Sequence, residues 1–164
     1  MSRFSRPPIY FPLFKERGPG GKVAKGPQPW GWPQGSKAGI LGRGKRMRYA
    51  ILSDIHSNLA ALEAVLADLK ARGGADQLWC LGDIVGYGPD PGECLDLLRR
   101  HDHVCVAGNH DWGAAGKVDL ETFNPDAAAA CLWNAQRLTE EQLCYLEGLP
   151  LELQASDFTL VHGS

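Results

Sequence analysis

Residues 48–72, RYAILSDIHSNLAALEAVLADLKAR, decide the class of fold because their periodicity changes in the middle. The run 48–53 is short, apolar and β-prone, which predicts a strand. From residue 58 to residue 72 the apolar side chains recur at helical spacing, with Asn58 as the N-cap and Gly73 as the stop. A strand that runs directly into a helix forms one βα unit.

The same unit recurs downstream. Residues 77–81 (QLWCL) predict a second strand, residues 93–100 (ECLDLLRR) a second helix and residues 103–107 (HVCVA) a third strand. Strands that alternate with helices indicate a parallel sheet built from βα units. The sequence therefore predicts an α/β fold.

The second half reads as more helical and then as extended. Residues 124–138 predict a helix with Asn124 as N-cap, and residues 139–149 predict another that opens with the spacing of a capping box. Residues 149–164 predict two strands around a turn at 155–157.

Each of the first three strands ends in a polar cluster, at residues 53–56, 82–83 and 108–111. Successive clusters are about one βα repeat apart, so we expect all three at the carboxyl edge of one sheet, where ligands bind in open α/β folds. His162 ends a fourth candidate strand. His101 and His103 fall at the opposite edge, which favours structural roles for them.

Two aspartates, Asp54 and Asp83, converge at the carboxyl edge with one asparagine and two or three histidines, and no lysine or arginine lies among them. Such carboxylate, amide and imidazole groups suit divalent manganese, iron, nickel or zinc. A carboxylate that bridges two ions creates a hydrolytic site in which the pKa of bound water falls from ~15.7 towards ~7. The first two clusters, taken alone, favour ordinary loops, and the third alone could be a turn. Their joint placement at one edge of the sheet favours a metal site.

Four short motifs, DIH, GDIVG, GNHD and VHG, resemble in this order those of the calcineurin-like metallophosphoesterases. That resemblance implies an αββα sandwich with a dinuclear metal centre between two sheets. It implies a phosphodiesterase or phosphatase that binds two divalent transition metal ions and acts on a phosphate ester or nucleotide. The implied metal ligands are Asp54, His56, Asp83, Asn109 and His162.

Two further residues have implied catalytic roles. The resemblance implies that Asp83 bridges both ions and that His110 stabilises the transition state or protonates the leaving oxygen. It implies that Asp111 orients His110 through its ring nitrogen. Tyr87 is a candidate substrate contact, although a solvated loop is the stronger interpretation of its segment.

The sequence departs from the family pattern at two places. Gly86 and Tyr87 stand where protein phosphatases and symmetrical diadenosine tetraphosphatases of the family have an Asp-Arg pair, which favours the small bacterial phosphodiesterase branch. The motif G-H-x-H is absent from the chain. We therefore expect residues 47–164 to be the N-terminal portion of the domain, lacking the C-terminal part of the second sheet and with little activity alone.

Residues 1–46 differ in composition from the rest. They hold ten of the 17 basic residues and one of the 19 acidic residues, with nine of the 20 glycines and seven of the 11 prolines. Such a segment cannot bury enough apolar surface to fold, which predicts a disordered basic leader. A nucleic-acid-binding arm is the functional alternative, and a non-native leader before a start at Met47 is favoured over it.

The remaining composition indicates the cellular location of the protein and leaves two classes of function open. No apolar run is long enough to span a membrane, and five scattered cysteines without a CxxC pair indicate free thiols in a reducing cytoplasm. The alternative to an enzyme is an inactive metallophosphoesterase-fold scaffold that binds a protein partner. The sequence leaves the oligomeric state and the natural substrate open.

Overall fold

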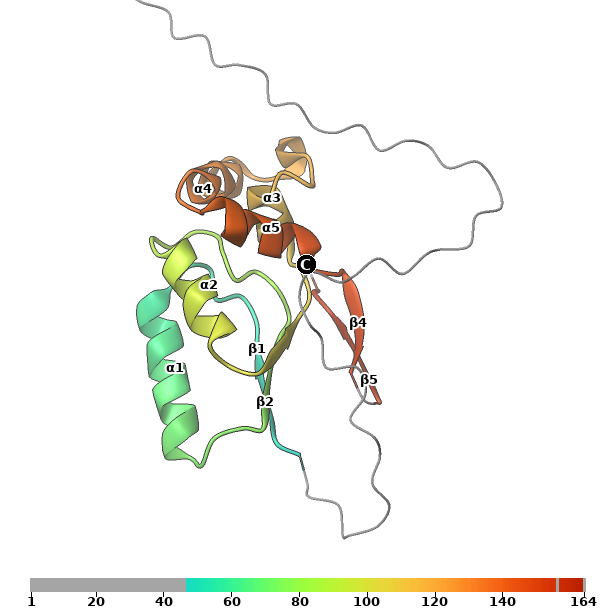
Figure 1. Ribbon diagram of the computed structural model, residues 1–164. Helices are drawn as coiled ribbons and strands as arrows, with labels where there is room; N and C mark the ends of the chain where they lie inside the picture. Colours follow the sequence, from blue (N-terminus) through green and yellow to red (C-terminus); the bar gives the residue numbers. More distant parts are fainter. Residues whose placement is uncertain (1–46, 156, 164) are drawn as a thin grey trace, which may run out of the picture. The chain divides into compact units, whose positions relative to one another are not determined.

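A computed structural model describes residues 47–155 and 157–163 of the chain (Figure 1). The predicted basic leader, residues 1–46, lies outside the described residues. The structure contains the following elements: β1 (Tyr49–Leu52), α1 (Leu59–Ala71), β2 (Gln77–Cys80), α2 (Pro91–Arg99), β3 (His103–Cys105), α3 (Asn109–Ala114), the 3-10 helix η1 (Leu120–Thr122), α4 (Pro125–Ala135), α5 (Glu140–Gly148), β4 (Glu152–Ala155) and β5 (Phe158–Val161).

Strands β1, β2 and β3 form a parallel sheet in that order, which confirms the predicted α/β class. Helices α1 and α2 lie on one side of this sheet (Figure 1). Leu62 of α1 and Leu95 and Leu98 of α2 are buried with Leu78 and Cys80 of β2 in the main apolar core. The helices therefore cover one face of the sheet, as βα connections require.

Strands β4 and β5 pair antiparallel as a separate hairpin. Leu160 of β5 is buried in a second apolar cluster with Trp79, Val104 and Val106, which come from the central strand, the third strand and the residues after it. The hairpin thus packs on the sheet face opposite to the helices, and its last strand leads to His162 beside the carboxyl edge of the parallel sheet.

The predicted helix starts are confirmed by their capping contacts. The Asn58 side chain accepts from the Ala61 amide at 3.1 Å, and the Asn124 side chain accepts from the Ala127 amide at 2.9 Å. Thr139 and Gln142 form the reciprocal bonds of a capping box. Two of the described helices were not predicted, α3 and the 3-10 helix η1. The first begins inside the polar cluster 108–111, and both are too short to show a helical period.

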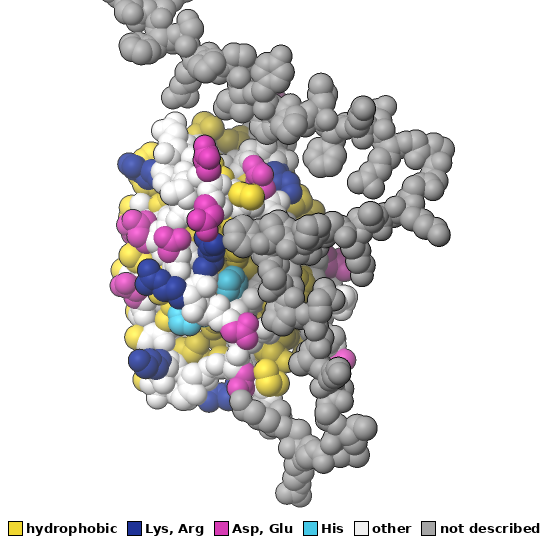
Figure 2. Space-filling model, in the orientation of Figure 1, with side chains coloured by type: hydrophobic (Ala, Val, Ile, Leu, Met, Phe, Trp, Pro, Cys, Tyr) yellow, Lys and Arg dark blue, Asp and Glu magenta, His cyan; other side chains and the backbone are white. Residues whose placement is uncertain are grey.

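The surface of the described domain carries both signs of charge. Acidic and basic side chains alternate over the uncovered part of the face in Figure 2. Among the described helices, none has the length and apolar character that crossing a membrane requires.

Candidate metal centre

The loops after β1 and β2 are held together by their backbones. Three amides of the first loop, those of Asp54, His56 and Ser57, donate to carbonyls of the second loop at 2.9 to 3.1 Å. Two polar clusters that are 29 positions apart in sequence therefore become neighbours, as the sheet topology predicts.

Backbone strain is concentrated in these two loops. Asp54, His56, Ser57 and Asp83 all have φ between +48° and +55°, a region that non-glycine residues rarely adopt. Each such conformation costs on the order of 1–3 kcal/mol and persists only where surrounding contacts enforce it. Four strained residues at one edge of the sheet mark that edge as a candidate functional site.

Glycines permit the closest approaches between the loops. A Cβ on Gly108 would lie against the Asp83 side chain, and a Cβ on Gly86 would lie against the His56 ring. Gly86, which stands where the tetraphosphatase pattern has aspartate, is therefore needed here to leave room for His56.

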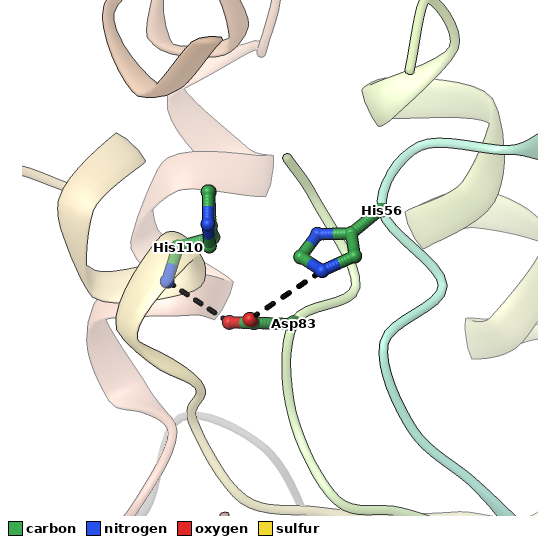
Figure 3. A group of neighbouring side chains, drawn as sticks. All are labelled: His56, Asp83 and His110. Carbon is green, nitrogen blue, oxygen red and sulfur yellow. Dashed lines mark hydrogen bonds and ion pairs between the residues drawn. The ribbon is translucent and has the colours of Figure 1, made fainter. Parts of the chain in front are cut away.

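Asp83 lies at the centre of the site and is only 3% exposed. One oxygen, Oδ1, accepts the His110 amide at 2.9 Å, while Oδ2 lies 3.7 Å from His56 Nε2 and 3.5 Å from His162 Nε2. Figure 3 shows the His56 ring and the His110 backbone nitrogen directed at this carboxylate from two sides.

The rings of His56 and His162 both direct Nε2 at that carboxylate. His162 Nδ1 lies 2.7 Å from the Leu81 carbonyl and His56 Nδ1 lies 3.3 Å from the Val85 carbonyl. A carbonyl only accepts, so in the neutral ring Nδ1 carries the proton and Nε2 has the free lone pair. Both Nε2 atoms then face the Asp83 oxygen too far away for a hydrogen bond.

This arrangement fits a metal ion. Lone pairs that face a carboxylate repel it unless a cation lies between them, and ligand bonds of about 2.0–2.2 Å suit nitrogen and oxygen atoms separated by these distances. The described residues contain two groups whose ligand atoms lie within 4.8 Å of one another. They are His56 with Asp83 and His110, and Asp54 with Asp83 and His162.

Asp83 belongs to both groups, which is the position expected of a bridging ligand. Its companions are His56 and His110 in one group and Asp54 and His162 in the other. Asp54 is exposed, and its Oδ1 is also 3.7 Å from His56 Nε2. Asn109 is half-buried at the first position of α3, directly beside His110.

The structure gives Asp111 a different partner from the one expected. Asp111 is fully buried, and its Oδ1 accepts the amides of Ile84 and Val85 while its Oδ2 accepts those of Asp83 and Gly108. All four contacts are 2.8 to 3.1 Å long. The expected contact with the His110 ring is replaced by a scaffold that fixes the loop carrying Asp83.

His110 Nδ1 instead lies 3.6 Å from the Cys131 thiol of α4. Burial lowers the pKa of His110 from its ordinary value, against the opposing effect of the Asp83 charge. Burial also raises the pKa of Asp111 to about 7, although backbone amides from Gly108 and Val85 pull it down. A buried, neutral imidazole can act at the reacting oxygen without a permanent charge.

Sequence reasoning missed a buried polar network that joins α4 to both loops. The Ser57 hydroxyl donates to Asn134 Oδ1 at 2.8 Å and accepts the Gly86 amide at 3.1 Å, while Asn134 Nδ2 donates to the Gly86 carbonyl. Asn134 lies inside a helix with no motif around it, so only its complete burial reveals its role.

Tyr87 lies closer to the centre than a solvated loop residue would. Its ring centroid is 4.7 Å from that of His110 and 5.1 Å from that of His56, although 54% of the residue is exposed. His103 bonds to the Tyr145 hydroxyl at the opposite edge, which confirms its structural role.

The protein family that this chain matches is the one that its four motifs resemble. The model of the calcineurin-like phosphoesterase family matches residues 47–164. An uncharacterized protein of Methanocaldococcus jannaschii, MJ0912, is 50% identical over 105 residues, which cover 64% of this chain and 43% of that protein. A symmetrical bis(5'-nucleosyl)-tetraphosphatase of Pseudomonas putida is 40% identical over 65 residues, which cover 38% of this chain and 22% of that enzyme.

A solved structure is also similar. The crystal structure of a metallophosphoesterase from Sphaerobacter thermophilus shares 50% identity with a TM-score of 0.60, covering 73% of this chain and 48% of that one. The chain thus spans less than half the length of each of these three relatives.

Proposed function

This chain belongs to the calcineurin-like phosphoesterase family, and from that premise we propose that the protein hydrolyses phosphate esters with the help of divalent metal ions. The observation that carries the proposal is the buried Asp83 carboxylate, faced by imidazole nitrogens of His56 and His162 at distances that suit shared metal coordination. The proposal concerns the whole protein, since the chain spans only part of its relatives' length.

We propose that the centre holds two ions and that Asp83 contacts both. The other ligands from this chain would be Asp54, His56, Asn109 and His162. Two divalent ions supply Lewis-acid activation of water and neutralise charge on the phosphoryl oxygens. The strained loops hold these side chains ready before an ion binds, so ordering them costs little at the moment of binding.

His110 is the proposed catalytic residue outside the ligand set. A nitrogen of its ring lies within 4.8 Å of an Asp83 oxygen, and its backbone amide donates to Asp83 Oδ1. The ring also contacts the Cys131 thiol and the rings of Tyr87 and Phe123. From there it can donate a hydrogen bond to the phosphoryl or leaving oxygen. Asp111 acts indirectly, because its four amide contacts fix the positions of Asp83 and of the start of α3.

For the substrate we propose a phosphodiester or nucleotide. A relative that is 40% identical over 65 residues is named a symmetrical bis(5'-nucleosyl)-tetraphosphatase, which supports this class. Gly86 and Tyr87 replace the Asp-Arg pair of the tetraphosphatase pattern, so the arginine that grips phosphate in that pattern is absent here. The five cysteines are all free, which supports action in a reducing cytoplasm.

The test is hydrolysis of bis-p-nitrophenyl phosphate, with added manganese, by the purified whole protein, which is the parent of every variant below. Asp83→Asn removes the shared carboxylate and His110→Ala removes the proposed proton donor, and each is expected to lower kcat/KM by about 10²-fold or more. Asp102→Asn and His101→Ala are matched controls at exposed positions on the far edge of the sheet.

Metal analysis of the same samples separates an enzyme from a scaffold. The parent protein is expected to retain close to two divalent transition metal ions per chain and Asp83→Asn fewer than one. Equal rates in the parent, Asp83→Asn and His110→Ala would contradict the proposed chemistry.

A further inference from the structure

A groove beside the metal centre has no role in the reaction described so far. It has a volume of about 380 Å³ and lies between the loop after Asp83 and one face of α4. Its lining consists of Tyr87, Gly88, Pro89, Ala129, Ala130, Trp133 and Asn134. A groove of this size falls within the range of sites for small organic ligands.

Two aromatic residues border the groove and both reach solvent. Tyr87 is 54% exposed and Trp133 is 37% exposed. Between them, Ala129 and Ala130 present short side chains that leave the space open, and Asn134 is committed to the backbone of Gly86. None of the lining side chains is charged, so the groove suits a flat, apolar ring more than a phosphate.

The position of Tyr87 connects this groove to the reacting centre. The same ring that lines the groove lies 4.7 Å from the His110 ring and 5.1 Å from the His56 ring, centroid to centroid. When the phosphate of a substrate lies at His110, the substituent attached to that phosphate can therefore enter the groove. A nucleoside 5'-phosphate has this form, because one sugar separates its base from its phosphate.

The Trp133 ring is held in place for stacking. The Arg137 guanidinium lies over it at 3.7 Å from the ring centroid. This cation–π contact covers one face of the indole and reduces its freedom to turn, which lowers the entropic cost of receiving a ligand.

We propose that this groove binds the nucleobase of a nucleotide substrate, with Tyr87 and Trp133 as its stacking residues. The proposal rests on the phosphoesterase function proposed above and adds the site that selects nucleosides. Every side-chain polar group of Asn134 is used internally and the remaining lining offers no charged group, so recognition is by ring stacking and tolerates different bases.

The kinetic test compares two diesters with the same leaving group, thymidine 5'-p-nitrophenyl phosphate and ethyl p-nitrophenyl phosphate. Trp133→Ala is expected to lower the ratio of their kcat/KM values by about fivefold or more, as loss of one aromatic stacking partner does. Tyr87→Ala is expected to lower the same ratio, and Trp133→Phe is expected to restore most of it.

The matched control is Leu132→Ala. Leu132 is 57% exposed, adjoins Trp133 on α4 and does not line the groove, so both substrates should keep their parent rates. A Trp133→Ala ratio equal to that of the parent, or equal losses on both diesters, would overturn the assignment of the nucleobase to this groove.

A binding measurement separates this proposal from the phosphoesterase function. Thymidine 5'-monophosphate is titrated calorimetrically into the parent protein and Trp133→Ala, with and without manganese. Weaker binding by the variant under both conditions supports the groove even if no hydrolysis is found, and identical affinities refute it even if hydrolysis is efficient. Absence of manganese-dependent hydrolysis of both diesters by the parent protein would contradict only the function.

Discussion

Asp111 shows how a residue can have the position its motif predicts and yet a different contact. Its motif implied a bond to the His110 ring, but its two oxygens accept four backbone amides from the loops after β2 and β3. A buried carboxylate with four amide donors organises both loops. Clustered backbone N–H groups form an anion-binding site, and here the Asp111 carboxylate fills that site.

We expect Asp111→Asn to lower the free energy of unfolding by about 1–3 kcal/mol, because the amide NH2 replaces one acceptor and leaves buried donors unpaired. Chemical denaturation monitored by circular dichroism measures this change. Asp102→Asn makes the same substitution at an exposed site and is expected to stay within about 0.5 kcal/mol of the parent. A change of that small size in Asp111→Asn would show that the four contacts contribute little.

At the scale of elements, α4 is tied to the metal centre although it supplies none of the proposed ligands. Cys131 contacts the His110 ring, Asn134 holds the Gly86 backbone and Trp133 lines the adjacent groove. These residues occupy one side of the helix. The helix therefore braces the loops from outside, as second layers of contacts do around metal ligands.

We expect Asn134→Ala to leave the Gly86 carbonyl without its donor and the Ser57 hydroxyl without its acceptor. The free energy of unfolding should fall by about 1–3 kcal/mol. Amide hydrogen exchange should become faster in residues 83–88. In β2 it should become faster only by the amount that the lower global free energy of unfolding accounts for. Gln136→Ala, at an exposed position after the same helix, is the control and should alter neither quantity measurably.

Across the whole domain, the two sheets are joined by a small apolar interface. Leu160 is 5% exposed and packs with Trp79, Val104 and Val106, which lie on the face of the parallel sheet away from α1 and α2. The hairpin carries His162 to the Leu81 carbonyl and the Asp83 carboxylate. The position of His162 in the site therefore depends on how the hairpin packs on the parallel sheet.

Leu160→Ala is expected to lower the free energy of unfolding by about 2–5 kcal/mol, as large-to-small changes in a core do. The same variant should bind manganese more weakly than the parent, because His162 depends on the hairpin's position. Val161→Ala removes a neighbouring side chain that is 49% exposed and should affect both quantities much less. Wild-type metal affinity in Leu160→Ala would show that His162 reaches the site without this interface.

The sequence by itself determined the order of strands and helices, because apolar periodicity and capping residues act over a few positions. It also determined that three polar clusters share one edge, because parallel strands end on the same side. It predicted which side chains meet: Asp54, His56, Asp83, His110 and His162 all lie at that edge.

Only the tertiary structure decided how those side chains are held. The amide contacts of Asp111, the thiol beside His110 and the Asn134 network depend on distances between segments 20 to 80 positions apart, which no local pattern encodes. The short helix α3 and the left-handed conformations in the loops arose for the same reason. Contacts across the site impose them against the intrinsic preferences of the residues, and such contacts exist only once the chain has folded.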